Sequence, residues 1–172
     1  MENINDLIEI SRNPIAYART MKSSGRKIIG YFCSYMPEEI VHAAGLHPMR
    51  LFGTKGDTSL ADKHLQSYCC SLVRGALTES IAGDLDFLDG TVFPHTCDSI
   101  QRLSDIWRMN TDHGFFADVV LPVKLTTPSA RQYMIDVMAR FKSDLEKHFG
   151  RPITDDDLSR SISLYNRIRS LL

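Results

Sequence analysis

Apolar residues occur along the chain in two patterns, as short continuous runs and at helical spacing. The short runs are rich in β-branched and aromatic residues, which is typical of buried strands. The predicted strands cover residues 27–33, 48–52, 90–94 and 117–122. Segments with helical spacing separate them, and such alternation is typical of parallel strands joined by right-handed crossovers. The pattern therefore predicts an α/β fold, an open, roughly four-stranded parallel sheet flanked by helices in a Rossmann- or flavodoxin-like lobe.

The segments between the predicted strands have recognisable helix ends. Pro37 and the two glutamates after it suit the first turn of a helix, and Thr154 suits the cap of the last helix. The predicted helices cover residues 3–22 with an interruption near Asn13-Pro14, 37–44, 60–82, 96–109, 128–148 and 154–172. The chain then divides into an N-terminal helical segment (1–24), an α/β lobe (25–150) and a C-terminal helix (151–172), which we expect to lead into a second lobe.

Composition and charge narrow the class of partner. The chain has 172 residues, of which 43% are hydrophobic and 24% charged, with a net charge of −1. This balance does not favour binding to nucleic acid or to an anionic membrane, so we expect neither. The start of the chain lacks the basic and apolar regions of a signal peptide, so a cytoplasmic location is expected. In a reducing compartment the four cysteines are expected as thiols, metal ligands or catalytic groups rather than disulfides.

Two of the cysteines follow predicted strands. Cys33 ends the first strand, and Cys97 lies after the third strand, at the start of a helix. Ligands of open α/β sheets bind beyond the carboxyl ends of the strands, and a helix start stabilises a thiolate. The alternative for either cysteine alone is a small buried residue. Because both are expected at one edge of the sheet, a shared site is the preferred interpretation.

The vicinal pair Cys69 and Cys70 requires separate treatment. On a helical wheel Cys69 falls within the apolar arc and Cys70 at its flank, provided that the helix is regular at this point. Cys69 is therefore expected to be a core thiol and Cys70 the one better able to face a site. The spacing of the cysteines does not match a structural zinc site, and the chain has no Walker-type or GxGxxG loop, so ATP or NAD binding is not indicated.

Other polar residues near the predicted edge leave alternatives open. His95 lies two residues before Cys97 and could line a site, although residues this close on a turn rarely form a nucleophile–base pair. Glu38 and Glu39 suit the first turn of a helix as partners of its dipole. They point about 100° apart, so at most one of them is expected to face the sheet edge.

Three motifs in this order resemble a known family. They are "GYFCSYMPEEIVHAAGLHPMRLFG", "YCCSLVRGAL" and "GTVFPHTCDSIQRLSDIW". Together they are similar to the iron–sulfur subunits of the 2-hydroxyacyl-CoA dehydratase and benzoyl-CoA reductase family. The resemblance covers the chain from about residue 25 onward, and the combination is specific although each motif alone is not.

The resemblance implies a set of site residues. Family members hold a [4Fe–4S] cluster with three cysteines per subunit, and two of these match Cys70 and Cys97. The third ligand of the family comes from a second α/β lobe that this chain lacks. Cys33 and Ser34, in the strand-turn motif, are expected to line the site together with His95. Glu39 is the expected site carboxylate.

The resemblance also implies a reaction. Family members remove water from a 2-hydroxyacyl-CoA after one electron reaches the thioester, and the resulting ketyl radical expels the hydroxyl group. An ATP-dependent iron–sulfur activator supplies the electron, and the site is completed by a second lobe or a paralogous subunit. The chain is thus expected to be a lyase component that is inactive and holds no stable cluster by itself. The alternatives are an aromatic acyl-CoA reductase component and a non-catalytic α/β module that has kept the fold.

Overall fold

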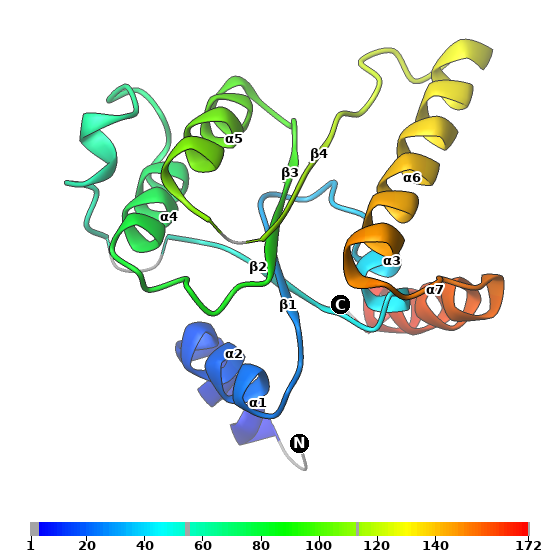
Figure 1. The fold of residues 1–172 in the computed structure, drawn as a ribbon, viewed down its shortest axis with the longest axis horizontal. Helices are drawn as coiled ribbons and strands as arrows, with labels where there is room; N and C mark the ends of the chain where they lie inside the picture. Colours follow the sequence, from blue (N-terminus) through cyan, green and yellow to red (C-terminus); the bar gives the residue numbers. More distant parts are fainter. Residues whose placement is uncertain (1–3, 54–55, 113, 172) are drawn as a thin grey trace.

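A four-stranded parallel sheet forms the centre of the molecule (Figure 1). The computed structural model describes residues 4–53, 56–112 and 114–171. The strands are β1 (Ile28–Tyr31), β2 (His47–Arg50), β3 (Gly90–Pro94) and β4 (Phe115–Val119), in the spatial order β2-β1-β3-β4. All three neighbouring pairs are parallel, so the predicted fold class is confirmed.

The register of the sheet brings the ends of neighbouring strands to one level. Tyr31, the last residue of β1, pairs with Arg50 at the end of β2 and with Val92 in β3. Every residue of β1 and β3 is buried. Burial on both faces explains why these strands appear in the sequence as continuous apolar runs rather than as alternating patterns.

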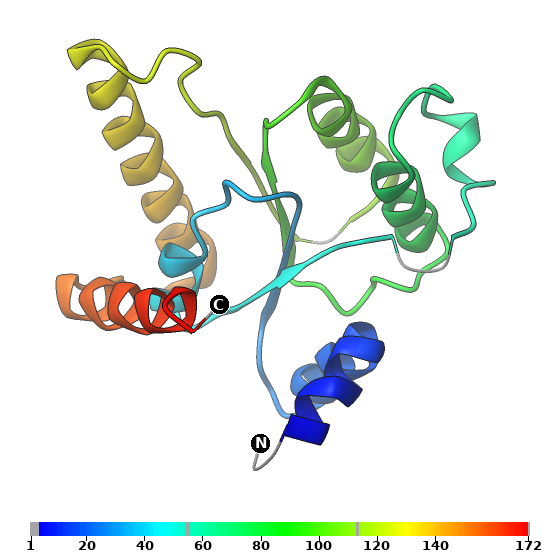
Figure 2. The ribbon, with the colours of Figure 1, turned by 180° about the vertical axis from the view of Figure 1, so that it is seen from behind.

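Helices cover both faces of the sheet (Figures 1 and 2). They are α1 (Ile4–Arg12), α2 (Pro14–Ser23), α3 (Glu38–Ala43), α4 (Ser71–Ile81), α5 (Asp98–Asn110), α6 (Pro128–Phe149) and α7 (Asp155–Arg169), with a 3₁₀ turn η1 (Ala61–Lys63). One face carries α4 and α5, and the other carries α3, α6 and α7, while α1 and α2 lie near the start of β1. Each face has its own hydrophobic core. Phe32, Phe93 and Trp107 pack together on the α4–α5 side.

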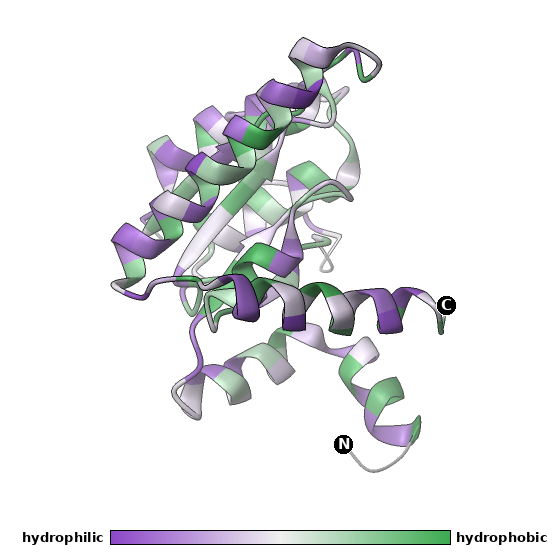
Figure 3. Ribbon diagram, turned by 90° about the vertical axis from the view of Figure 1, so that its right-hand side faces the viewer, coloured by the Kyte–Doolittle hydropathy of each residue, from purple (hydrophilic) through white to green (hydrophobic). Residues whose placement is uncertain are grey.

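The predicted C-terminal end of α6 and the predicted N-cap of α7 are confirmed, although α7 ends at Arg169 rather than at residue 172. Gly150 closes α6 with a left-handed backbone, φ 68°. Thr154 caps α7, and its hydroxyl and the Asp157 carboxylate form a reciprocal capping box. Hydrophilic and hydrophobic residues alternate along α7, the helix that leads to the C-terminus in Figure 3. This helix packs on α3 through Ser161, whose hydroxyl donates to the Glu39 carbonyl at 2.8 Å.

The predicted helix over residues 60–82 is wrong in its first half. Only the short η1 turn and α4, which begins at Ser71, are helical in this region. The preceding segment folds back on α4, because Arg74 binds the Asp62 carboxylate and the Thr58 hydroxyl. The buried hydroxyl of Thr78 also accepts the backbone N–H of Ala61 at 3.1 Å. These contacts with α4 override the helical spacing of the apolar residues.

His47, the first residue of β2, makes stability depend on pH. Burial lowers its pKa below the ordinary 6.5, and the charges of Arg26 and His42 lower it further. The unfolded chain then binds a proton that the folded chain excludes, so the free energy of unfolding falls as the pH drops through about 6.5. Urea denaturation between pH 8 and pH 5 is expected to show this slope, and the slope is expected to be shallower in His47→Gln. Equal slopes for the two proteins would contradict the assignment.

Candidate functional site

The candidate site lies at the carboxyl edge of the sheet, where several of the predicted residues follow the strands. Cys33 follows β1 by two residues, and Cys97 follows β3 by three residues and caps α5. Because β1 and β3 are adjacent and parallel, both cysteines lie at the same edge of the sheet, as predicted. His95 directly follows β3 at this edge.

Two exposed cysteines cap neighbouring helices. Cys70 is the N-cap of α4 and Cys97 the N-cap of α5, and these helices pack against each other. Neither cysteine forms a side-chain hydrogen bond to the backbone of its helix. Serine, threonine, aspartate and asparagine are the residues that stabilise such positions. Capping therefore does not explain these two thiols, and the positive ends of the two helices favour negative charge beside them.

Cys69 has the opposite environment. It is 4% exposed and belongs to the core on the α4–α5 side of the sheet. The predicted contrast between a buried Cys69 and an exposed Cys70 is therefore confirmed, although the helical wheel behind it is not. Cys70 is exposed because it lies just before α4 rather than within it. Its own backbone is extended, with φ −62° and ψ 154°.

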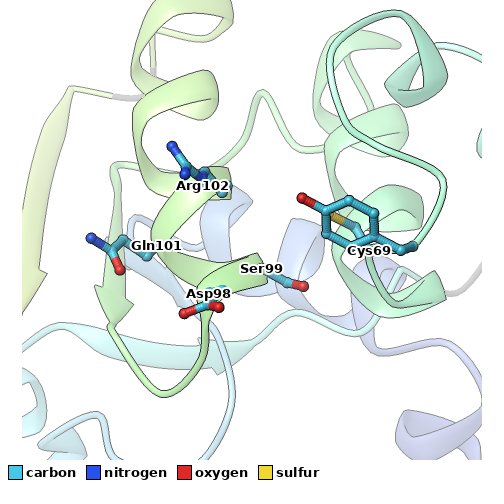
Figure 4. A pocket seen from close by; sticks show the side chains of 6 residues that line it. Cys69, Asp98, Ser99, Gln101 and Arg102 are labelled. Atoms are coloured by element: carbon cyan, nitrogen blue, oxygen red, sulfur yellow. The ribbon is translucent and has the colours of Figure 1, made fainter.

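A pocket of about 280 Å³ separates the segment before α4 from the first turns of α5. It is lined by Tyr68, Cys69, Asp98, Ser99, Gln101 and Arg102. In Figure 4, Ser99 of α5 points toward the segment that contains Cys69, whereas Gln101 points away from it. Most of the lining side chains are polar, so the hollow, which is lined by the sequence neighbours Cys69 and Asp98 of the two capping cysteines, can accept a polar ligand. This pocket was not predicted from the sequence, because it depends on where α4 begins.

Cys33 has an unusual backbone. Its φ of 55° is the only positive value for a residue other than glycine in the described part of the chain. Left-handed backbone is costly for residues that have a Cβ atom, and such strain is concentrated at functional sites. Ser34, the next predicted site residue, is exposed. Cys33 is half-buried, so this bend at the carboxyl end of β1 is only partly exposed.

The strain at Cys33 predicts a difference between two substitutions. Cys33→Gly and Cys33→Ala both remove the sulfur, but only glycine adopts the left-handed backbone without cost. We expect the glycine variant to be more stable than the alanine variant by about 1 kcal/mol. Chemical denaturation of both variants measures the difference. A more stable alanine variant would show that the backbone of this turn is not strained.

His95 is held by a partner that was not predicted from the sequence. Its Nε2 atom lies 2.8 Å from the Asp118 carboxylate of β4, and the hydroxyl of the buried Ser104 donates to the same oxygen at 2.5 Å. The carboxylate therefore fixes the orientation of the imidazole at the sheet edge. The clue in the sequence was an acidic residue inside the apolar run of β4, "FFADVV".

The two glutamates of α3 point to different partners. Glu39 accepts a hydrogen bond from Arg169 of α7 at 2.7 Å. Glu38 instead accepts from the hydroxyl of Tyr31 at the end of β1. Burial, with the hydrogen bond to Glu38, raises the pKa of the Tyr31 hydroxyl. Glu38 is thus the residue that contacts the strand end, and a catalytic role of Glu39 stays a prediction.

The exposed thiols fit part of an iron–sulfur site. Cysteine thiolates are the ordinary ligands of [4Fe–4S] clusters, and Cys70 and Cys97 supply two of them from adjacent helix starts. Within the described ranges, no group of three or more histidine, cysteine, aspartate or glutamate residues has the arrangement of a metal site. Further ligands would have to come from outside these residues.

No helix in the described part of the chain is long and apolar enough to cross a membrane.

Comparison with known proteins gives one family. Residues 33–172 match the family described as 2-hydroxyglutaryl-CoA dehydratase, D-component. A benzoyl-CoA reductase subunit of Thauera aromatica is 33% identical over 149 residues, which cover 86% of this chain and 39% of that protein. The (R)-phenyllactyl-CoA dehydratase beta subunit of Clostridium sporogenes is 28% identical over 169 residues, covering 98% of this chain and 45% of that protein. The beta subunit of (R)-2-hydroxyglutaryl-CoA dehydratase of Acidaminococcus fermentans is 29% identical over 169 residues, 97% of this chain and 45% of that protein. The chain thus spans less than half the length of these curated relatives.

Proposed function

Because the chain belongs to the 2-hydroxyglutaryl-CoA dehydratase D-component family, we propose that it is an iron–sulfur component of a 2-hydroxyacyl-CoA dehydratase. The family predicted from the three sequence motifs is thereby confirmed. The main support for the proposed iron–sulfur role is the pair of exposed cysteines, Cys70 and Cys97. They cap adjacent helices at the carboxyl edge of the sheet.

In this proposal Cys70 and Cys97 hold two irons of a [4Fe–4S] cluster. When bound, the cluster supplies low-potential one-electron chemistry to the thioester of a 2-hydroxyacyl-CoA. The starts of α4 and α5 stabilise the negative charge of the thiolates. The packed aromatic core around Phe32 keeps water away beneath the site. His95, oriented by Asp118, provides a polar group at its rim.

The proposed partners complete the site. The relatives are named as subunits and are more than twice as long as the matched region. We propose that a second lobe or a paralogous subunit supplies the further cysteine ligand. An ATP-dependent iron–sulfur activator would deliver the electron. The chain alone is not expected to hold a stable cluster or to turn over an acyl-CoA.

A second candidate function is supported by one of the comparisons. The identity of 33% with the benzoyl-CoA reductase subunit is higher than that with the two dehydratase subunits. An aromatic acyl-CoA reductase component is therefore the alternative. It differs in reaction, because the aromatic ring is reduced and no water is lost.

One experiment separates these functions. The chain is purified without oxygen together with its partner and the activator, and is given a 2-hydroxyacyl-CoA or benzoyl-CoA with ATP and a reductant. We expect loss of water from the first substrate, detected by the mass of the acyl-CoA product. Reduction of benzoyl-CoA alone would favour the reductase. An iron-free assembly that acts on neither substrate and cannot be reconstituted would identify a non-catalytic module.

A further inference from the structure

Arg50 is a basic residue at the carboxyl edge that the proposed cluster site does not use. It is the last residue of β2 and pairs with Tyr31 of β1. Beyond this pair, the backbone N–H of Leu51 donates to the carbonyl of Tyr31 at 2.9 Å. The residues after Arg50 therefore start beside those that lead to Cys33. Arg50 lies at the edge where parallel α/β sheets bind their ligands.

The Arg50 side chain stacks on an aromatic ring and has no acceptor among the residues that the structure describes. Its guanidinium carbon lies 5.1 Å from the centroid of the Phe52 ring, a cation–π arrangement. Its Nε atom is buried and has no hydrogen-bond partner in residues 4–53, 56–112 and 114–171. Among the described residues, Arg50 forms none of the ion pairs found at 4.0 Å or less. Buried donors are nearly always paired, and leaving a charged one unpaired is costly, so this arginine requires an explanation.

The two acidic residues of α3 have other partners. The Glu38 carboxylate accepts the Tyr31 hydroxyl, and the Glu39 carboxylate binds Arg169. Arg50 and Tyr31 are strand partners, and the positive charge of Arg50 opposes the rise in the pKa of Tyr31 that burial causes. The fold therefore places a guanidinium beside Tyr31, whose hydroxyl already occupies the Glu38 carboxylate, and no described carboxylate forms an ion pair with it.

We propose that Arg50 is a substrate-binding residue that pairs with a phosphate group of the acyl-CoA, an inference that rests on the proposed function. A planar guanidinium presents parallel N–H donors that match phosphate oxygens, and such charge-assisted pairs are stronger than bonds to a neutral oxygen. The Phe52 ring fixes the guanidinium plane before the ligand arrives. A negatively charged group also supplies the missing counter-charge, which the neutral carbonyl of the thioester does not.

The test uses the complete assembly and measures binding of CoA and of pantetheine, which lacks the phosphates. Calorimetry is expected to show Arg50→Gln binding CoA at least tenfold more weakly than the unaltered assembly, as for loss of a charge-assisted hydrogen bond. Pantetheine is expected to bind both proteins equally. Arg50→Lys keeps the charge but not the paired donors and is expected to lose affinity for CoA by a smaller factor. Arg108→Gln, on an exposed arginine paired with Asp105, is the matched control.

Each outcome has a separate meaning. If the unaltered assembly does not bind CoA, the proposed function fails, and the assignment of Arg50 fails with it. If it binds CoA and Arg50→Gln binds equally well, only the assignment of Arg50 is overturned. Equal weakening for CoA and pantetheine would also overturn it, because the contact would then be with the pantetheine arm. If Arg50→Gln does not fold, Arg50→Lys decides, and unchanged CoA affinity in that folded variant overturns the proposal.

Discussion

Cys70→Ala and Cys97→Ala are each expected to remove most of the iron from the complete, anaerobically purified assembly. Each thiol is exposed, begins a helix and forms no bond to the helix that it caps. A cluster bound by three cysteines that loses one of them has two open irons instead of one. Iron and sulfide analysis, with the visible absorption of the cluster, measures the loss, and dehydratase activity is expected to disappear with it.

The neighbouring thiol provides the control for this result. Cys69→Ala removes a sulfur one residue away, but this sulfur lies in the hydrophobic core. The variant is expected to keep its iron and to lose about 1 kcal/mol of stability through packing. Iron loss in Cys69→Ala and none in Cys70→Ala would reverse the assignment. Unchanged iron in all three variants would remove the main support for the proposed function.

The fold could be predicted from the sequence where whole strands are buried on both faces. β1 and β3 are buried on both faces, so their apolar runs marked them clearly, and Gly150 and Thr154 marked helix ends by local chemistry alone. The region before α4 could not be predicted in this way. Its path depends on contacts between this region and α4, such as that of Asp62 with Arg74, which the spacing of apolar residues does not encode.

The site was predictable where residues follow strands and was missed where partners meet across elements. Cys33, His95 and Cys97 could be placed from strand ends alone, because parallel strands share one carboxyl edge. Asp118 was missed because its relation to His95 requires the pairing of β4 with β3. The environment of Arg50 also depends on a strand pairing, that of β2 with β1.

Gly53→Ala is expected to cause a large loss of stability although it adds only one methyl group. The loop containing Gly53 packs directly on α4, the helix that Cys70 caps. A Cβ atom on Gly53 would lie 2.7 Å from both the Ala76 nitrogen and the Leu72 carbonyl oxygen. Both are backbone atoms of the helix, so no side chain can rotate away. The φ of 63° adds the cost of a left-handed backbone. Together these effects are expected to cost about 3 kcal/mol.

Gly25→Ala separates the two causes. Gly25 also has a positive φ, 86°, but a Cβ atom there would meet nothing within 4 Å. It is therefore expected to lose only the backbone contribution, about 1 kcal/mol, in urea denaturation followed by circular dichroism. The difference between the two variants measures the contact between the loop and α4. Equal losses would mean that the loop moves away from α4 at little cost. In that case the packing of this loop would not hold α4, and its capping Cys70, in place.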